Sequence, residues 1–151
     1  MADKITLTLT DCTFFTNGSQ TQSSQVIGYE DSGKKKHVVR YKLDIPSTSN
    51  GTHNFSVEKK NLGLGSDSHG ATFGFYITTD EKSYINPDVN APHFDLVKGT
   101  NSLSGDCEFV LLPNTTYYVW FFPTKEVTFG WYYWNYPSDI SASGDEGAGI
   151  T

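Results

Sequence analysis

The sequence predicts an all-β protein that forms a single antiparallel β-sandwich of about 8–10 short strands. Aromatic residues make up 15% of its 151 residues, with 10 Phe, 9 Tyr and 3 Trp against a single Met. Rings and β-branched residues favour strands over helices. Short apolar runs recur throughout the chain, separated by Gly, Pro, Asn and Ser. No window carries apolar residues at helical spacing over three turns, which argues against a helical bundle.

Alternation of apolar and polar residues predicts the strands of the first half of the chain. Residues 5–15 begin with isoleucine and leucine on one face and threonine on the other, and we expect one half-buried strand there. Residues 38–45 alternate in the same way. Their buried face is predicted to consist of Val39, Tyr41, Leu43 and Ile45. The shorter strands expected in this half lie at 25–29, 53–57 and 71–78.

The second half begins with a long polar connection at 79–92 that contains Asn-Pro-Asp and Ala-Pro sequences. Turn chemistry of this kind predicts a loop. The strands expected after it lie at 94–96, 107–112, 117–122 and 127–136. We therefore predict one sandwich domain over residues 1–136. The Ser-, Gly- and acid-rich residues 137–151 are expected to be a tail or a strand stub.

Charge and hydropathy exclude two classes of partner. The net charge is −6, and the one basic cluster, Lys34 to Lys36, follows Asp-Ser-Gly and is expected in a turn. Nucleic-acid binding needs clustered cations, so we expect no nucleic-acid partner. No apolar run approaches the roughly 20 residues of a membrane span, so no membrane insertion is expected. The N-terminus passes directly into a strand pattern, which predicts that there is no signal peptide.

Catalytic and metal-binding patterns are lacking in the sequence. Cys12 and Cys107 are too far apart for a Cys-x-x-Cys site, and we expect free thiols rather than a disulfide. Asn86, Asp88, Asn90 and Asp95 have oxygens suited to Ca²⁺, but their spacing favours a polar turn. No pair of histidines has metal-ligand spacing among His37, His53, His69 and His93. We therefore predict a non-enzymatic chain with no cofactor and no metal.

One local pattern is specific. Residues 111–117 read Leu-Leu-Pro-Asn-Thr-Thr-Tyr and precede an aromatic strand. This pattern resembles the tyrosine corner of fibronectin type III and other immunoglobulin-like sandwiches. The resemblance implies that the ring of Tyr117 is buried and that its hydroxyl group binds the backbone of the preceding crossover. Pro113 fixes φ in this segment, and Asn114 tolerates a turn conformation.

The segment from Tyr117 to Tyr136 is predicted to be a hairpin with its loop at 124–126. Side chains then sort by parity, and the face that contains Tyr117, Val119 and Phe121 is expected to be core. On the other face, Trp120 would lie across from Gly130. The residues of that face proposed to contact a ligand or partner are Tyr118, Trp120, Tyr132, Trp134 and Tyr136.

Three alternatives account for this second aromatic face, because a sandwich strand normally has one polar face. The N-terminal strands or the C-terminal tail cover it and make it ordinary core. Alternatively it is a protein–protein interface, where Tyr and Trp are favoured. A third alternative is a sugar-binding platform, since the apolar C–H faces of pyranose rings stack on Trp and Tyr. The aromatic content alone does not separate the three.

The chain also resembles small β-sandwich proteins of bacteriophage tails, baseplates and capsid decorations. The resemblance lies in the Thr-rich opening strand, the LLPNTTYYVWFFP segment and the GWYYWNY segment. It implies a structural or attachment component of a virion, made in the host cytoplasm, whose partners are other virion proteins or further copies of itself. The alternative function is a carbohydrate-binding module, with an extracellular location, that binds host or environmental glycans through the exposed rings.

Overall fold

Strands joined by turns and loops make up the described part of the chain. The computed structural model describes residues 4–21, 26–30, 34–47, 52–60, 72–98, 102–124, 132–135 and 141–145. These residues form twelve strands and no helix, so the prediction of an all-β antiparallel fold is confirmed. Consequently no helix in these ranges is long and apolar enough to cross a membrane.

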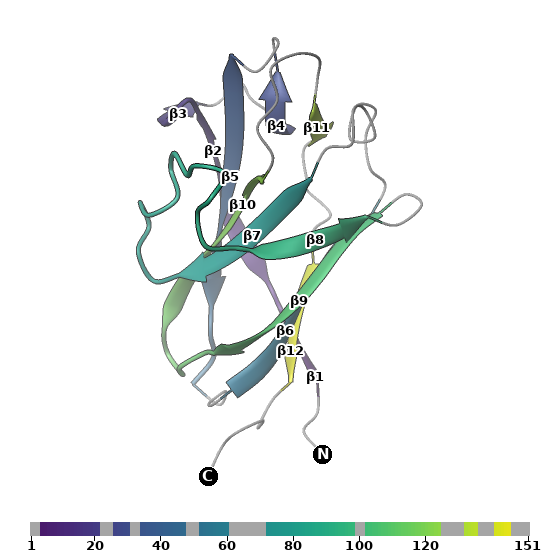
Figure 1. Cartoon of the computed structure of the whole chain (residues 1–151). Helices are drawn as coiled ribbons and strands as arrows, with labels where there is room; N and C mark the ends of the chain where they lie inside the picture. Colours follow the sequence, from purple (N-terminus) through teal and green to yellow (C-terminus); the bar gives the residue numbers. More distant parts are fainter. Residues whose placement is uncertain are drawn as a thin grey trace.

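The strands form two antiparallel sheets that share one strand (Figure 1). The first sheet has the order β1 (Lys4–Leu7), β12 (Ser141–Asp145), β6 (Thr52–Lys60), β9 (Ser102–Val110) and β8 (Phe94–Lys98). The second continues from β8 through β7 (Phe73–Thr78), β10 (Thr116–Pro123), β5 (Lys35–Asp44), β2 (Leu9–Thr16) and β3 (Ser19–Thr21). The first three residues of β5 also pair with β4 (Val26–Glu30). The strand β4 pairs in turn with β11 (Tyr132–Asn135).

The shared strand β8 turns the sheet back on itself. Residues 94–96 pair with β7, whereas residues 97 and 98 pair with β9. Gly105 on β9 permits this close approach. A Cβ atom there would lie 2.8 Å from the Phe75 ring and 2.9 Å from the Asp95 carbonyl oxygen. Those distances are shorter than a carbon side chain tolerates, so a residue without a side chain is needed at this corner.

Side chains from both sheets pack into one core, as in a sandwich. The prediction for 38–45 is confirmed, because Val39, Tyr41, Leu43 and Ile45 are all buried in this core. The first sheet contributes Phe55, Val57, Leu103 and Cys107 from β6 and β9. The second sheet adds Phe73, Phe75 and Ile77 from β7 and Tyr117, Val119 and Phe121 from β10. Parity therefore assigned the core face of β10 correctly.

The tyrosine-corner contact is present at the start of β10. Tyr117 is buried, and its hydroxyl oxygen accepts a hydrogen bond from the Leu112 backbone N–H at 2.8 Å. Asn114 has a positive φ of 53°, the turn conformation expected for it. This local prediction is confirmed, while the wider resemblance to immunoglobulin-like domains stays a prediction.

Several strand boundaries differ from the prediction. Residues 5–15 are not one strand, because the chain breaks at Thr8 and passes from β1 in the first sheet to β2 in the second. Lys35 and Lys36 belong to β5 rather than to a turn. One strand was missed, namely β3, which an Asn17-Gly18 turn joins to β2 with positive φ at both residues, as in a type I′ hairpin.

The strand β12 lies in the segment that was expected to be a tail or a strand stub. It lies between β1 and β6, so residues 141–145 form a strand within the first sheet. Its serine-rich sequence lacks the apolar alternation by which a strand is recognised. The boundary at residue 136/137 lies in a range that the structure does not describe.

Candidate functional site

The outer face of the second sheet divides into a covered half and an open half. The loop at 79–93 between β7 and β8 lies over the covered half (Figure 1, teal). Beneath and within it is a second aromatic cluster of buried residues, formed by Phe15, Val38, Tyr84, Trp120 and Phe122. The Tyr84 ring stacks on Phe122 with a centroid distance of 5.5 Å. Burial raises the pKa of the Tyr84 hydroxyl group.

Two cations of β5 hold this loop against the sheet. Arg40 donates a hydrogen bond from Nη1 to the carbonyl oxygen of Glu81, and Lys36 donates from Nζ to the carbonyl oxygen of Pro87. The Asp80 carboxylate accepts a hydrogen bond from the Lys82 backbone N–H at 2.8 Å, which lowers the pKa of Asp80. The loop is therefore ordered by its own turn and by charged side chains beneath it.

Trp120 lies at the centre of the covered half and is 0% exposed. Its ring packs on Phe15 and Tyr84, at centroid distances of 5.6 and 6.2 Å. The indole N–H has no hydrogen-bond partner among the described residues. The prediction that Trp120 faces a ligand is therefore wrong for this structure. Of the three alternatives for the aromatic face, ordinary core applies to this half, and the covering segment described here is the 79–93 loop.

The predicted hairpin from Tyr117 to Tyr136 is also wrong. β10 is central in the sheet, with β5 on one side and β7 on the other, so β11 pairs with β4 instead. Trp120 consequently pairs with Arg40 and Tyr76 and not with Gly130. In β11, Tyr132 pairs with Tyr29 and Trp134 with Ile27. The side chains of Tyr132 and Trp134, and the whole of Tyr136, lie outside the described residues. Their role stays a prediction.

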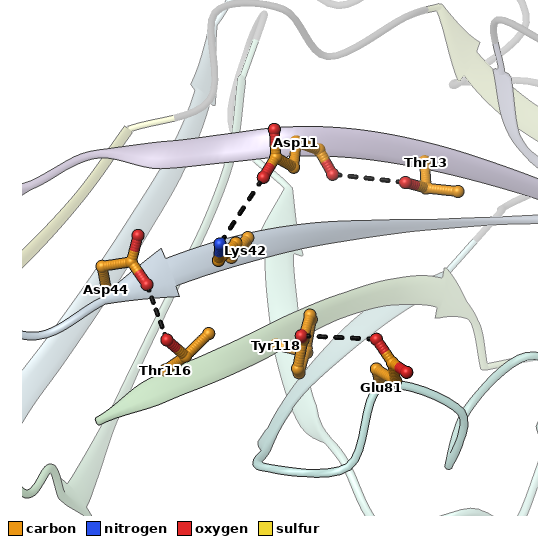
Figure 2. A network of polar contacts seen from close by, with 7 residues as sticks. All are labelled: Asp11, Thr13, Lys42, Asp44, Glu81, Thr116 and Tyr118. Atoms are coloured by element: carbon orange, nitrogen blue, oxygen red, sulfur yellow. Dashed lines mark hydrogen bonds and ion pairs between the residues drawn. The ribbon is translucent and has the colours of Figure 1, made fainter.

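Tyr118 is the predicted site residue that lies at the border of the two halves, partly buried against the second cluster (Figure 2). Its half-buried ring is held by the Arg40 guanidinium group, whose central carbon lies 5.2 Å from the ring centroid. A cation in this position is attracted to the face of the ring. The Tyr118 hydroxyl group lies 3.5 Å from the Glu81 carboxylate and donates a weak hydrogen bond to it. The ring therefore has a fixed position at the edge of the loop.

Polar side chains from three neighbouring strands lie on the same side of the sheet as this ring (Figure 2). On the β10–β5 pair, Thr116 donates a hydrogen bond from Oγ1 to Asp44 Oδ1 at 2.7 Å. Across the β5–β2 pair, Lys42 Nζ lies 3.8 Å from Asp11 Oδ2. We call this surface the Tyr118 face. It consists of Asp11, Thr13, Arg40, Lys42, Asp44, Glu81, Thr116 and Tyr118.

A β-bulge places Asp11 on the Tyr118 face. The register of β2 against β5 shifts between Thr10 and Thr13, and Asp11 has a positive φ of 49°. Bulges add a residue to one strand and redirect its side chain. The Asp11 carboxylate is thereby directed toward Lys42 while remaining 72% exposed. A regular strand would have directed residue 11 inward beside Tyr41.

Sequence reasoning found Tyr118 and missed the rest of this face. Arg40 and Lys42 alternate with the buried residues of β5, so their outward direction was available from the pattern. The pairing of β10 with β5, which joins these cations to Tyr118, connects residues more than seventy positions apart. Lys42, Tyr118 and Thr78 become neighbours only through this long-range pairing.

The remaining sequence candidates do not converge on a site. Asp88 accepts a hydrogen bond from the Asn90 backbone N–H, as expected for a polar turn, and Asp95 lies 3.3 Å from His93. His37 is buried against the Thr16 hydroxyl group. No group of three or more His, Cys, Asp or Glu side chains in the described ranges could hold a metal ion. Both cysteines are described, and no disulfide joins Cys12 to Cys107.

Comparisons with known proteins give only distant likenesses. No protein-family model matches the chain, and no curated protein matches it. The chain is similar in structure to a xylan-binding module, CBM15, with a TM-score of 0.46 and 12% identity over 97% of this chain and 98% of that one. It is also similar to a GH31 α-xylosidase from Xanthomonas citri, with a TM-score of 0.34 and 13% identity. That match covers 93% of this chain but 16% of the enzyme.

At these identities and TM-scores the likenesses do not assign the chain to either family. The expected virion role stays a prediction. The absence of catalysis likewise stays a prediction.

Proposed function

We propose that this chain is a carbohydrate-binding module that holds a polysaccharide on the Tyr118 face. The observation that carries the proposal is an aromatic ring fixed on an open sheet surface among hydrogen-bonding side chains of three strands. A tyrosine ring offers an apolar surface to the C–H face of a pyranose. Carboxylate and hydroxyl groups beside it accept hydrogen bonds from sugar hydroxyls, and carboxylates do so strongly.

The surface is already organised for this contact. Neighbouring strands lie ~4.8 Å apart, so β10, β5 and β2 together span roughly 10 Å across the face. Arg40 fixes the Tyr118 ring, and the Thr116 and Lys42 contacts orient the two carboxylates of Asp44 and Asp11. Side chains held in place before binding lose little conformational entropy when the ligand arrives.

A protein interface is less well supported by the same surface. The cores of protein interfaces are depleted of charged residues, whereas the Tyr118 face carries five charged side chains. The large hydrophobic residues exposed in the described ranges are Val97, Val110 and Leu112, none of which belongs to this face. A polar, half-aromatic surface fits a hydroxyl-rich ligand better than an apolar partner.

The proposal is tested by titrating the protein with neutral and acidic polysaccharides in affinity gels and by calorimetry. We expect binding to one class, weakened at least tenfold by Tyr118→Ala, which is about 1.4 kcal/mol. Tyr118→Phe keeps the ring and should bind within a few-fold of wild type. Val97→Ala, an exposed residue of the first sheet, is the control with unchanged affinity. A folded protein that binds no glycan, or a Tyr118→Ala variant that binds normally, contradicts the proposal.

A further inference from the structure

The charges of the Tyr118 face bear on which polysaccharides it accepts. The face carries two cations, Arg40 and Lys42, and the carboxylates of Asp11, Asp44 and Glu81. Carboxylates are therefore in excess on this surface. The whole chain has a net charge of −6, so the surrounding field has the same sign.

Both cations already have partners within the protein. Lys42 Nζ lies 3.8 Å from the Asp11 carboxylate. Arg40 donates to the Glu81 carbonyl oxygen, and its guanidinium carbon lies 5.2–5.5 Å from the centroids of Phe15, Tyr118 and Trp120. Withdrawing Arg40 to bind an anion would release the loop that covers the second aromatic cluster. Arg40 is therefore held by the protein, and Lys42 is paired with a carboxylate of the same face, so the cations do not outweigh the carboxylates.

The carboxylates, in contrast, remain accessible. Asp44 and Glu81 are exposed, and the Asp11 side chain is 72% exposed. An ionised carboxylate only accepts hydrogen bonds, so it suits the hydroxyl groups of a neutral sugar. A carboxylate on the ligand would lie beside an excess of charges of its own sign, which disfavours binding.

We infer that the Tyr118 face selects neutral polysaccharides and rejects polyuronates, an inference that rests on the function proposed above. The neutral chain contributes its hydroxyl hydrogens to Asp11, Asp44 and Glu81 while one ring stacks on Tyr118. A uronate chain of the same backbone makes the same ring contact but places a negative charge among the three carboxylates. Selection therefore comes from repulsion as well as from attraction.

Matched oligosaccharides test this inference. The probes are gluco-, manno- and galacto-configured hexasaccharides, each with its counterpart oxidised at C6 to the uronate, and xylohexaose with and without a glucuronate side group. For each neutral oligosaccharide that the wild-type protein binds, we expect its uronate counterpart to bind at least tenfold more weakly at low salt. Raising the salt concentration should narrow that difference, because it screens exposed charges.

Charge variants separate this inference from the proposed function. Asp44→Asn combined with Glu81→Gln keeps one acceptor oxygen in each side chain and removes two negative charges, so the preference for the neutral ligand should fall several-fold. Glu108 is an exposed charged residue on the outer face of the first sheet, so Glu108→Gln should leave the preference for the neutral ligand unchanged. Equal or tighter binding of the uronate by wild type overturns the inference while the proposed function stands. Binding of neither ligand overturns both.

Discussion

The hydroxyl group of Tyr117 accepts a hydrogen bond from the backbone N–H of Leu112, 2.8 Å away and five residues earlier. This contact ties the start of β10 to the crossover that brings the chain from the first sheet to the second. With Tyr117 directed into the core, the next side chain along the strand, Tyr118, is directed to the opposite side of the sheet. The hydrogen bond of Tyr117 therefore helps to set the side on which Tyr118 lies.

Tyr117→Phe should destabilise the fold by about 1–2 kcal/mol, because it removes this hydrogen bond while keeping the buried ring. Urea unfolding measures the loss. Tyr118→Phe is the matched control, since its hydroxyl group makes only the weak 3.5 Å contact with Glu81, and we expect a change within about 0.5 kcal/mol. Equal losses from the two variants would contradict a structural role for the Tyr117 hydroxyl group.

Trp120→Ala should lower the free energy of unfolding by about 3–5 kcal/mol, as expected for truncating a large buried ring. Trp120→Phe should cost about half as much or less. It keeps an aromatic ring beside Phe15 and Tyr84 and removes an indole N–H that has no partner in the described residues. Urea unfolding of wild type and both variants measures these losses from the shift of the midpoint, provided that the m-values agree. A small loss from Trp120→Ala would mean that the ring is not core.

Arg40→Met should expose the 79–93 loop to trypsin. The substitution removes the hydrogen bond to the Glu81 carbonyl oxygen and the charge above three rings, and we expect cleavage after Lys82 to accelerate about tenfold. Mass spectrometry of timed digests identifies the cut. Lys42→Met, which removes a cation paired with exposed Asp11, serves as the control and should leave this cleavage rate unchanged.

Alkaline pH should destabilise the protein through Cys107. Burial raises the pKa of this thiol from 9.0 to about 12, with Asp106 adding to the shift. Between these values the unfolded chain loses the proton and the folded protein keeps it, so the contribution of Cys107 to stability is constant below about pH 9 and falls as pH rises above it. The slope approaches about 1.4 kcal/mol per pH unit.

The difference between wild type and Cys107→Ala isolates this contribution, because the other titrating groups cancel. Urea unfolding at intervals from pH 7 to 10.5 should show the two stability curves converging as pH rises above 9. Cys12→Ala retains Cys107 and should keep the wild-type decline. Parallel curves for wild type and Cys107→Ala would show that the Cys107 thiol titrates normally.

Local patterns predicted much of the fold, because they reflect forces within one strand or turn. The alternation in β5 identified four buried side chains, and the Pro-Asn-Thr-Thr-Tyr sequence identified the hydrogen bond of Tyr117. The break at Thr8 has no comparable signal. Continuous alternation across it hides a change of sheet that arises only when β1 pairs with β12 near the other end of the chain.

The candidate site was predicted less completely, because it is built from residues that long-range pairing brings together. Parity placed Tyr118 and Trp120 on one face correctly, but it did not show that the 79–93 loop covers only the Trp120 half. Tyr84 and Ile85, apolar residues in a polar loop, were the available sign that this loop packs on something. The bulge that directs Asp11 toward Lys42 has no signature in the sequence around it.

The pairing of β1 with β12 also decides how the domain responds to mechanical load. Lys4 pairs with Asp145, so the first residue of β1 and the last residue of β12 lie side by side in the first sheet (Figure 1). A force that pulls Lys4 and Asp145 apart acts across this antiparallel pair and opens its hydrogen bonds one after another, from Lys4 toward Leu7. Peeling of this kind yields at lower force than shearing all the bonds together. The strands of the Tyr118 face belong to the other sheet, so β1 would detach before the load reaches that face.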